Sequence, residues 1–399
     1  MSGPLAGVRI LDLSSVVMGP YATQLLGDYG ADVIKIESPD GDIMRLSGPM
    51  RNPGMGHLYL NSNRNKRSVV IDLKTVAGRD VLLNLAKNAD ALVYNIRPQT
   101  MVRLGLGYED VCAANPSIVY VGAFGFSQRG PYASRPAYDD LIQGMSGIPW
   151  LVKQAGAAEP RYAPMILADR TVGLQLALAI TSALFHRQRT GRGQRVDVPM
   201  FEGMLSVVLG EHLAGKCFDP PEGVEGYKRS LTRGRRPYRT KDGYICTLIY
   251  VDKHWRNFFE AIGEPEMFQS DARFASQGAR LEHIDEVYEY LSEVISRRST
   301  QEWVDLLGRA DIPVARMYSI DDILGDEHLA AIGYFQKSEH PSEGSITTLA
   351  IPTEWSDSLP EAPRHAPKLG ENTVDVLREA GYTLAAIHAL VEQGAVKVA

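Results

Sequence analysis

The sequence predicts an α/β protein with a large domain built on a mostly parallel sheet and a smaller α+β domain. Two observations lead to this prediction. In the first half of the chain short apolar runs alternate with helical segments, whereas the middle of the chain is charged and patterned for helices. Strands that alternate with helices form right-handed crossovers and therefore a mainly parallel sheet. A chain of 399 residues is long enough to form two domains.

The strand–helix alternation begins near the N-terminus. We expect strands over residues 8–13, 33–36, 68–73, 91–94 and 118–123, separated by helices over residues 21–29, 76–86 and 102–114. Pro20 suits the first turn of a helix, and Gly30 suits a helix end. This order is Rossmann-like, and sheets of that kind bind ligands at the carboxyl ends of their strands.

Two shifts in composition mark the expected domain boundaries. Residues 1–215 form the first part of the large domain, and the stretch 217–239, rich in Gly, Pro and Arg, is interpreted as a loop. Residues 225–325 form the small domain, with helices expected over 255–262, 284–297 and 300–309. Residues 330–399 form a linker and C-terminal helices that return to the large domain, with a helical pattern over 369–391.

Composition argues against several classes of protein. The net charge of −6 gives no support to a nucleic-acid partner or an anionic membrane partner. Cys112, Cys217 and Cys246 are far apart, and no HExxH motif occurs, so we expect neither disulfides nor a metal site. The N-terminus lacks the pattern of a signal peptide, and the apolar stretch 171–185 is too short to span a bilayer. We therefore expect a cytoplasmic protein in which residues 171–185 form a buried core helix.

The opening strand–helix–strand unit does not carry the signature of a dinucleotide enzyme. Glu37 ends the second expected strand, where such an enzyme would hold a ribose. The phosphate-binding GxGxxG motif is missing, because the corresponding segment reads SSVVMG over residues 14–19. The sequence therefore predicts a nucleotide-type fold without a nicotinamide cofactor.

Asp169 lies just ahead of the apolar helix expected over residues 171–185. Asp is among the commonest N-capping residues, so a capping role explains its position. A carboxylate at a helix N-terminus is also favoured in its ionised form and could attack an acyl carbon. Local spacing does not separate these two roles.

Two groups of basic residues are candidates for binding anions. Residues 63–67 read NRNKR ahead of an expected strand, and Arg97 and Arg103 follow another, which suits the phosphates of a nucleotide-like ligand or a solvated loop. The stretch 228–239 carries further Lys and Arg residues and favours an anionic substrate at least as much as a nucleic acid.

Seven segments in the same order together resemble the class III CoA-transferases, the CaiB/BaiF family, whose members include formyl-CoA transferase and L-carnitine CoA-transferase. The segments are residues 4–13, 30–37, 63–68, 71–74, 95–98, 190–197 and 369–373. The resemblance places the family's catalytic aspartate on Asp169. It also implies an interlocked homodimer and no permanently bound cofactor, with coenzyme A and acyl-CoA as co-substrates.

The resemblance also implies a set of contacts to coenzyme A. They fall on Val17, Met18, Ile71, Asp72, Leu73, Lys74, Asn95, Arg97, Arg103, Ala137, Tyr138 and Asp139. Ser38 stands where relatives carry Arg, which removes one expected contact. Asp139 is expected to be a supporting carboxylate near the reacting centre.

The implied reaction moves coenzyme A from an acyl-CoA donor to a carboxylic acid through an aspartyl-CoA thioester on Asp169. The alternative is an α-methylacyl-CoA racemase, which uses the aspartate as an acid or base together with a histidine in a Gly-His-Asp segment. Here Tyr138 occupies the histidine position, which argues against racemisation. A non-catalytic CoA-binding protein is the third hypothesis.

The substrate is inferred from the arginine-rich stretch. Formyl-CoA–oxalate transferases carry a glycine-rich loop in this region, and its absence here argues against oxalate as the acceptor. We expect one or more of Arg233, Arg235 and Arg236 to pair with the second carboxylate of a short dicarboxylic acid, with succinyl-CoA as an example of a donor. A pocket around Trp255 for an aromatic acid is the second hypothesis.

Overall fold

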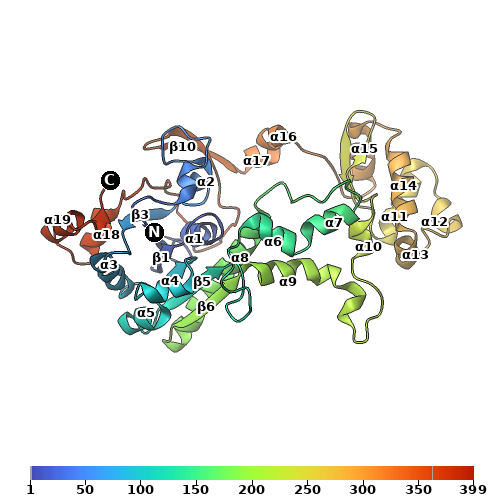
Figure 1. Ribbon diagram of the computed structural model, residues 1–399. Helices are drawn as coiled ribbons and strands as arrows, with labels where there is room; N and C mark the ends of the chain where they lie inside the picture. The colour runs from blue at the N-terminus through green and yellow to red at the C-terminus, as the bar shows by residue number, and fades with distance from the viewer. Residues whose placement is uncertain (1, 362) are drawn as a thin grey trace. The chain divides into compact units, whose positions relative to one another are not determined.

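The computed structural model describes residues 2–361 and 363–399, and the chain divides into two compact units (Figure 1). The first unit comprises Met1–Ser146, Pro164–Ser206 and Gly333–Ala399, and the second comprises Gly147–Ala163 and Val207–Ile332. Residues 147–163, which the sequence left in the large domain, belong to the second unit because helix α7 (Ile148–Gln154) packs on α10 (Lys228–Leu231).

A seven-stranded sheet forms the centre of the first unit, in the order β12-β3-β2-β1-β4-β5-β6. The strands are β1 (Arg9–Leu13), β2 (Asp32–Glu37), β3 (Lys66–Ile71), β4 (Ala91–Tyr94), β5 (Val119–Phe124), β6 (Gln194–Pro199) and β12 (Val396–Lys397). Neighbouring strands are parallel, except that β12 pairs antiparallel with β3. The expected α/β class is confirmed, and β6 and β12 are strands that the sequence analysis did not include.

The strand order reverses beside β1. Strands β2 and β3 follow on one side of β1, and β4, β5 and β6 follow on the other. This is the doubly wound Rossmann order, in which a crevice opens between the carboxyl ends of the strands on either side of the reversal. Residues that follow β1 and β4 therefore meet at the place where such sheets bind ligands.

Helices cover both faces of this sheet. One face packs against α3 (Val76–Ala86), α5 (Tyr108–Ala114), α18 (Thr373–Glu379) and α19 (Leu384–Glu392). The helix expected over 102–114 is two helices, α4 (Pro98–Arg103) and α5, separated at Gly105 with φ +68°. The C-terminal helix is likewise divided into α18 and α19 at Gly381, where φ is +90°. A positive φ suits glycine and ends a helix.

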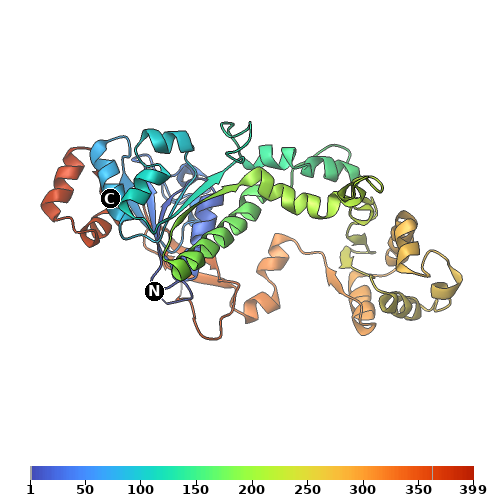
Figure 2. The same cartoon turned by 90° about the horizontal axis from the view of Figure 1, so that it is seen from below.

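The long helix α8 (Leu167–Thr190) packs beside α1 (Met18–Asp28), as Figure 2 shows. The expectation of a buried core helix holds for only one face of α8 in the single chain. Leu174, Leu178 and Phe185 share one face of α8 and are 53%, 67% and 58% exposed in the single chain. Only the face that meets α1 and the sheet is buried, because the helix lies on the surface of the first unit.

The second unit has its own core. A three-stranded antiparallel sheet of β7 (Tyr238–Arg239), β8 (Tyr244–Thr247) and β9 (Val314–Arg316) packs with α11 (Asp252–Ile262), α14 (Ile284–Ile295) and α15 (Thr300–Arg309). The core is rich in aromatic side chains, among them Trp255, Phe258, Phe259, Phe274 and Trp303. Ser299 and Glu302 form a capping box that starts α15.

The remaining elements are shorter or connect the two units. They are η1 (Ile43–Leu46), α2 (His57–Leu60), α6 (Asp139–Met145), α9 (Met200–His212), η2 (Ala214–Cys217), α12 (Met267–Ser270), α13 (Gln277–Glu282), α16 (Ile320–Leu324), α17 (Glu327–Ala331), β10 (Phe335–His340) and β11 (Gly344–Leu349). Within the described ranges, no helix combines the length and apolarity that a bilayer crossing needs. Nor do those ranges bring three or more metal-ligating side chains into one cluster.

Candidate active site

Asp169 lies in the first turn of α8, which begins three residues earlier than a capping role for Asp169 would require, because Ile166 is the N-cap residue. The cap is supplied instead by Asp139, whose Oδ1 accepts the backbone N–H groups of Ala168 at 2.7 Å and Asp169 at 3.1 Å. Gln143 donates to the second oxygen of Asp139 at 2.6 Å. The local alternative that Asp169 caps α8 is therefore wrong, and its carboxylate is left for another role.

The carboxylate of Asp169 meets the N-terminus of α1. Its Oδ1 accepts the backbone N–H of Met18 at 3.2 Å, and Asp169 is only 7% exposed. Met18 is the first residue of α1, so its N–H has no partner within its own helix. Burial and the nearby charge of Asp139 raise the pKa of Asp169 to about 6, although the Met18 hydrogen bond and Arg170 act in the opposite direction.

Asp169 opens onto a cavity of about 350 Å³. The cavity lies at the sheet's point of reversal, since its walls follow the carboxyl ends of β1, β4 and β5. It is lined by Ser15, Val16, Met18, Asn95, Ile96, Arg97, Pro98, Ala123, Phe124, Gly125, Gln128, Ala133, Arg135, Pro136, Ala137, Tyr138 and Met200. Arg97 and Arg135 are exposed there and form no ion pair with any residue that the structure describes.

The loop between β1 and α1 is held on two sides. Asn95 donates to the carbonyl of Ser15 at 2.8 Å and accepts its N–H at 3.1 Å. Asp42 accepts the N–H of Val16 at 3.2 Å and pairs with the buried Lys35, which also donates to the carbonyl of Ser14. Val16 has a φ of +75°, which is costly for a β-branched residue and persists only where surrounding contacts enforce it. These contacts fix the loop that leads directly to the Met18 N–H.

A second cavity, of about 440 Å³, lies at the carboxyl ends of β2 and β3. Ser15 and Ile96 line both cavities, so one ligand could extend from one to the other along this edge of the sheet. Ser38 lines the second cavity and leaves it without the arginine expected in relatives.

The structure divides the predicted CoA-contacting residues between these two cavities. Met18, Asn95, Arg97, Ala137 and Tyr138 line the cavity of Asp169, and Ile71, Asp72, Leu73, Lys74 and Arg103 line the second. Val17 is buried and lines neither cavity, and Asp139 is buried by its capping role. The side-chain amide of Asn95 is hydrogen-bonded to the backbone of Ser15, so it has a structural role in addition to any ligand contact.

The basic residues of the segment 63–67 do not form a phosphate site. Lys66 is fully buried against Asp12 at 2.9 Å, and Arg64 and Arg67 pair with acidic side chains of the first unit. Burial alone would raise the pKa of Asp12, but the charges of Lys66 and Lys35 and the hydrogen bonds from Ser14 and Thr23 together lower that pKa to about 2. These cations therefore stabilise buried carboxylates.

Glu37 has a comparable internal role. Its carboxylate accepts both Nε and an Nη of Arg45, at 2.8 and 2.7 Å, and the hydroxyl of Ser68 at 2.6 Å. A carboxylate so engaged is not available to hold a ribose, which agrees with the missing GxGxxG motif.

The arginines proposed from sequence for substrate binding belong to the second unit. Arg233, Arg235 and Arg236 are exposed on the second unit, and none of the cavities described here includes them. Sequence reasoning did not single out Asp42, Lys35 or Arg135. The first two carry no recognisable motif, and Arg135 reaches the cavity only through the fold of the loop after β5.

Comparison with known proteins gives one consistent family. The model of CoA-transferase family III matches residues 5–373. An acyl-CoA transferase of Fusarium pseudograminearum is 31% identical over 98% of this chain and 88% of its own length. A formyl-CoA:oxalate CoA-transferase of Shigella sonnei is 30% identical over 96% of this chain and 97% of its own.

Two crystal structures are similar throughout. A Mycobacterium tuberculosis protein superposes with a TM-score of 0.81 at 29% identity, covering 94% of this chain and 99% of its own. A CAIB/BAIF family protein from Brucella suis gives a TM-score of 0.79 at 29% identity, covering 95% of this chain and all of its own.

Proposed function

The chain belongs to CoA-transferase family III and is a CoA-transferase, and on this premise we propose that Asp169 is its covalent nucleophile. One observation carries the proposal: a buried carboxylate opens onto the cavity at the sheet's point of reversal and accepts a helix N-terminal N–H on Oδ1. The hydrogen bond positions one oxygen, and the other is free of hydrogen bonds from the described residues and can attack an acyl carbon.

The proposed reaction conserves acyl activation at each step. The Asp169 carboxylate attacks the thioester carbonyl of the donor, the C–S bond breaks, and a mixed anhydride and a CoA thiolate result. The thiolate then attacks the Asp169 carbonyl, which releases the donor acid as a carboxylate and leaves an aspartyl-CoA thioester. The acceptor carboxylate attacks that thioester, and the released thiolate takes the acceptor's acyl group from the second anhydride. Asp169 is then again a carboxylate.

The N–H of Met18 has a direct role in this scheme. When the thiolate or the acceptor attacks the Asp169 carbonyl, negative charge develops on an Asp169 oxygen. An N–H already placed 3.2 Å from Oδ1 donates to that oxygen without reorganisation. The clamped loop between β1 and α1 keeps this donor in position.

Coenzyme A is proposed to extend along the edge of the sheet from the second cavity to Asp169. Lys74 and Arg103 provide positive charge in the second cavity, which suits the phosphates of the nucleotide end. The thiol end would then reach the Asp169 cavity past Ser15 and Ile96, the residues common to both. The family uses coenzyme A thioesters as co-substrates.

For the acids, we propose short dicarboxylic acids, with succinyl-CoA as a donor. Arg135 and Arg97 line the Asp169 cavity without acidic partners among the described residues, so a second carboxylate can pair with one of them. Arg135 therefore replaces Arg233, Arg235 and Arg236 as the proposed partner. The name of the Shigella relative gives oxalate, itself a dicarboxylic acid, as a substrate of that protein.

A homodimer is the proposed assembly. The face of α8 that carries Leu174, Leu178 and Phe185 is apolar and exposed in the single chain. A surface helix with such a face is stabilised when a second copy covers it.

The test is intact mass spectrometry after incubation with succinyl-CoA. We expect the wild-type protein to gain the mass of coenzyme A less one water, and Asp169→Asn to gain none. Hydroxylamine should remove the adduct and leave a hydroxamate on Asp169. If a panel of acyl-CoA thioesters leaves the mass unchanged while the protein exchanges the α-proton of a branched acyl-CoA, the racemase alternative is correct.

A further inference from the structure

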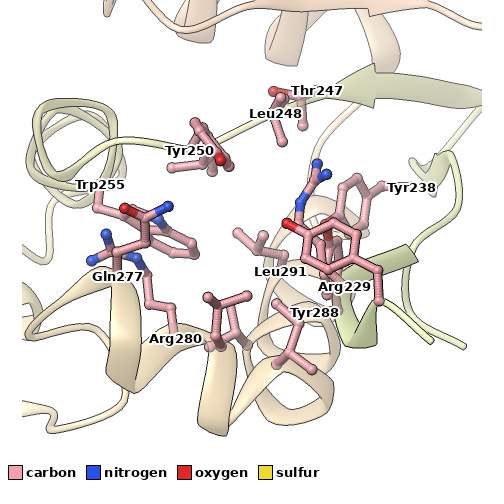
Figure 3. Close-up of a pocket in the computed structure, with 15 residues that line it drawn as sticks. Arg229, Tyr238, Thr247, Leu248, Tyr250, Trp255, Gln277, Arg280, Tyr288 and Leu291 are labelled. Carbon is pink, nitrogen blue, oxygen red and sulfur yellow. The ribbon is translucent and has the colours of Figure 1, made fainter. Parts of the chain in front are cut away.

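The second unit contains a cavity of its own, between the end of β8 and helices α11, α13 and α14 (Figure 3). Its walls are mainly aromatic and aliphatic. Trp255, Gln277 and Arg280 lie on one side, Arg229 and Tyr238 lie opposite, and Tyr250 and Leu248 lie above them in the view. The lining also includes Tyr227, Thr247, Ile249, Leu281, Ile284, Val287, Tyr288 and Leu291.

The two arginines of this cavity differ in their partners. Arg280 is 5% exposed and is neutralised, because it pairs with Asp252 and donates to the carbonyl of Phe274 at 2.7 Å. Arg229 is partly buried and makes no ion pair or hydrogen bond with the residues that the structure describes. Its guanidinium carbon lies 5.6 Å from the centre of the Tyr250 ring. The cavity thus offers one uncompensated positive charge.

A guanidinium that is partly withdrawn from water beside apolar walls binds an anion more strongly than a solvated one does. Its planar array of N–H groups matches a carboxylate, which it can bind through two hydrogen bonds. Trp255 lies opposite Arg229 in Figure 3, and the neighbouring Arg280 is already paired with Asp252, so this side of the cavity has no free charge and suits a hydrocarbon group. The ligand therefore has one anionic end and one apolar end.

The volume of the cavity limits the size of that ligand. The cavity measures about 50 Å³, and one water-sized group needs roughly 10–15 Å³ on this measure. The interior of the cavity therefore holds roughly three to five water-sized groups of a ligand. A short aliphatic acid fits, whereas the pantetheine arm of coenzyme A is too long and a dicarboxylate would place its second charge against Trp255.

We propose that this cavity binds a short aliphatic monocarboxylic acid of about three to five carbons, with its carboxylate on Arg229 and its hydrocarbon end between Trp255 and Leu291. The site goes beyond the proposed function, because neither Asp169 nor any residue of the two cavities of the first unit lines it. Its occupancy can be measured without turnover.

The test is a titration of tryptophan fluorescence in the full-length Asp169→Asn protein, without coenzyme A. Trp255 lies in the cavity wall and reports on its occupant. The probes are isobutyrate and its uncharged counterpart isobutyramide, with phenylacetate and succinate as acids of other sizes and charges. The variants are Arg229→Gln and, as a matched control, Arg235→Gln, which removes an exposed arginine of the same stretch.

We expect saturable binding of isobutyrate, at least tenfold weaker binding of isobutyramide, and at least tenfold weaker binding of isobutyrate to Arg229→Gln, since a charge-assisted pair is lost in each case. Arg235→Gln should bind like the parent. Equal binding of acid and amide, preference for succinate or phenylacetate, or no saturable signal from isobutyrate would each overturn the proposal. The comparison of acid with amide needs no variant, so it decides the matter even if Arg229→Gln does not fold. The aspartyl-CoA adduct is measured separately in the wild type.

Discussion

The side-chain amide of Asn95 makes two hydrogen bonds with the backbone of Ser15. Its Nδ2 donates to the Ser15 carbonyl oxygen at 2.8 Å, and its Oδ1 accepts the Ser15 N–H at 3.1 Å. The two residues follow β4 and β1, the strands on either side of the point where the strand order reverses. The side chain of one strand end therefore fixes the backbone of the other. This loop leads to Met18, so the contact also determines where the hydrogen-bond donor of Asp169 lies.

Replacing Asn95 by Ala is expected to lower kcat about tenfold to 100-fold, because a small displacement of a positioned group has effects of that size. Steady-state kinetics with saturating coenzyme A thioester measure the change. Asn95→Asp, which keeps the acceptor of the Ser15 N–H but loses the donor, should fall between the wild type and Asn95→Ala. A rise in KM with unchanged kcat would instead identify Asn95 as a simple ligand contact.

The raised pKa of Asp169 predicts opposite effects of pH on activity and on stability. Activity requires the carboxylate, so kcat/KM should fall about tenfold per pH unit below about pH 6. Stability changes the other way. The carboxyl binds its proton more tightly in the folded state than in the unfolded state. The free energy of unfolding is therefore highest below about pH 4 and decreases as the pH rises through about 6.

The variant Asp169→Asn separates the two effects. It is expected to be inactive but more stable than the wild type at pH 7, by about 1–3 kcal/mol, because it removes a buried charge. Chemical denaturation at pH 7 and at pH 4 measures the difference in the free energy of unfolding. The gain should disappear at pH 4, and an equal gain at both pH values would show that the buried charge is not its cause.

Asp139 is expected to act through α8 and not on the substrate. Asp139→Ala removes the acceptor of the Ala168 and Asp169 N–H groups and should lower the free energy of unfolding by about 1–2 kcal/mol. Asp139→Asn keeps an acceptor oxygen and should be less destabilised. It also removes a negative charge near Asp169, so the acidic limb of its pH–rate profile should move to lower pH. An unshifted profile would contradict this role.

The exposed face of α8 predicts that a charge at its centre weakens association of two chains. Leu178→Asp should shift the protein from dimer toward monomer in size-exclusion chromatography with light scattering, since Leu178 is 67% exposed in the single chain. Exposed Leu384 on α19 offers a matched control, and Leu384→Asp should leave the dimer intact. A wild-type protein that is monomeric at all concentrations would reject the proposed assembly.

The sequence predicted five strands of the parallel sheet because each is a mainly apolar run. It missed β6, in which polar and apolar residues alternate. It predicted less well where a single glycine divides a helical pattern, as at Gly105 and Gly381. The pairing of Asp139 with the first turn of α8 joins residues about thirty positions apart in the chain. Only the tertiary structure could therefore show that the cap comes from Asp139 and not from Asp169.

The same limit applied to the charged residues. Residues 63–67 and the arginines after 228 look alike in sequence, as basic groups in polar surroundings. In the structure Lys66 is buried against Asp12, whereas Arg235 is exposed. Whether a cation has a carboxylate partner depends on contacts between distant segments. Composition therefore identified the basic residues but did not show which of them have carboxylate partners.

Arg135 provides the last prediction, because its position in the Asp169 cavity makes it the proposed partner of a second substrate carboxylate. Arg135→Gln should raise the KM for a dicarboxylic acceptor about tenfold or more and leave the KM for a monocarboxylic acceptor of the same length nearly unchanged. Arg235→Gln should affect neither acid, because Arg235 lines none of the described cavities. Competition between succinate and butyrate in a coupled assay measures the preference directly. If Arg135→Gln loses both acids equally, Arg135 holds coenzyme A or the loop and not the second carboxylate, and the preference for dicarboxylic acids must come from another group.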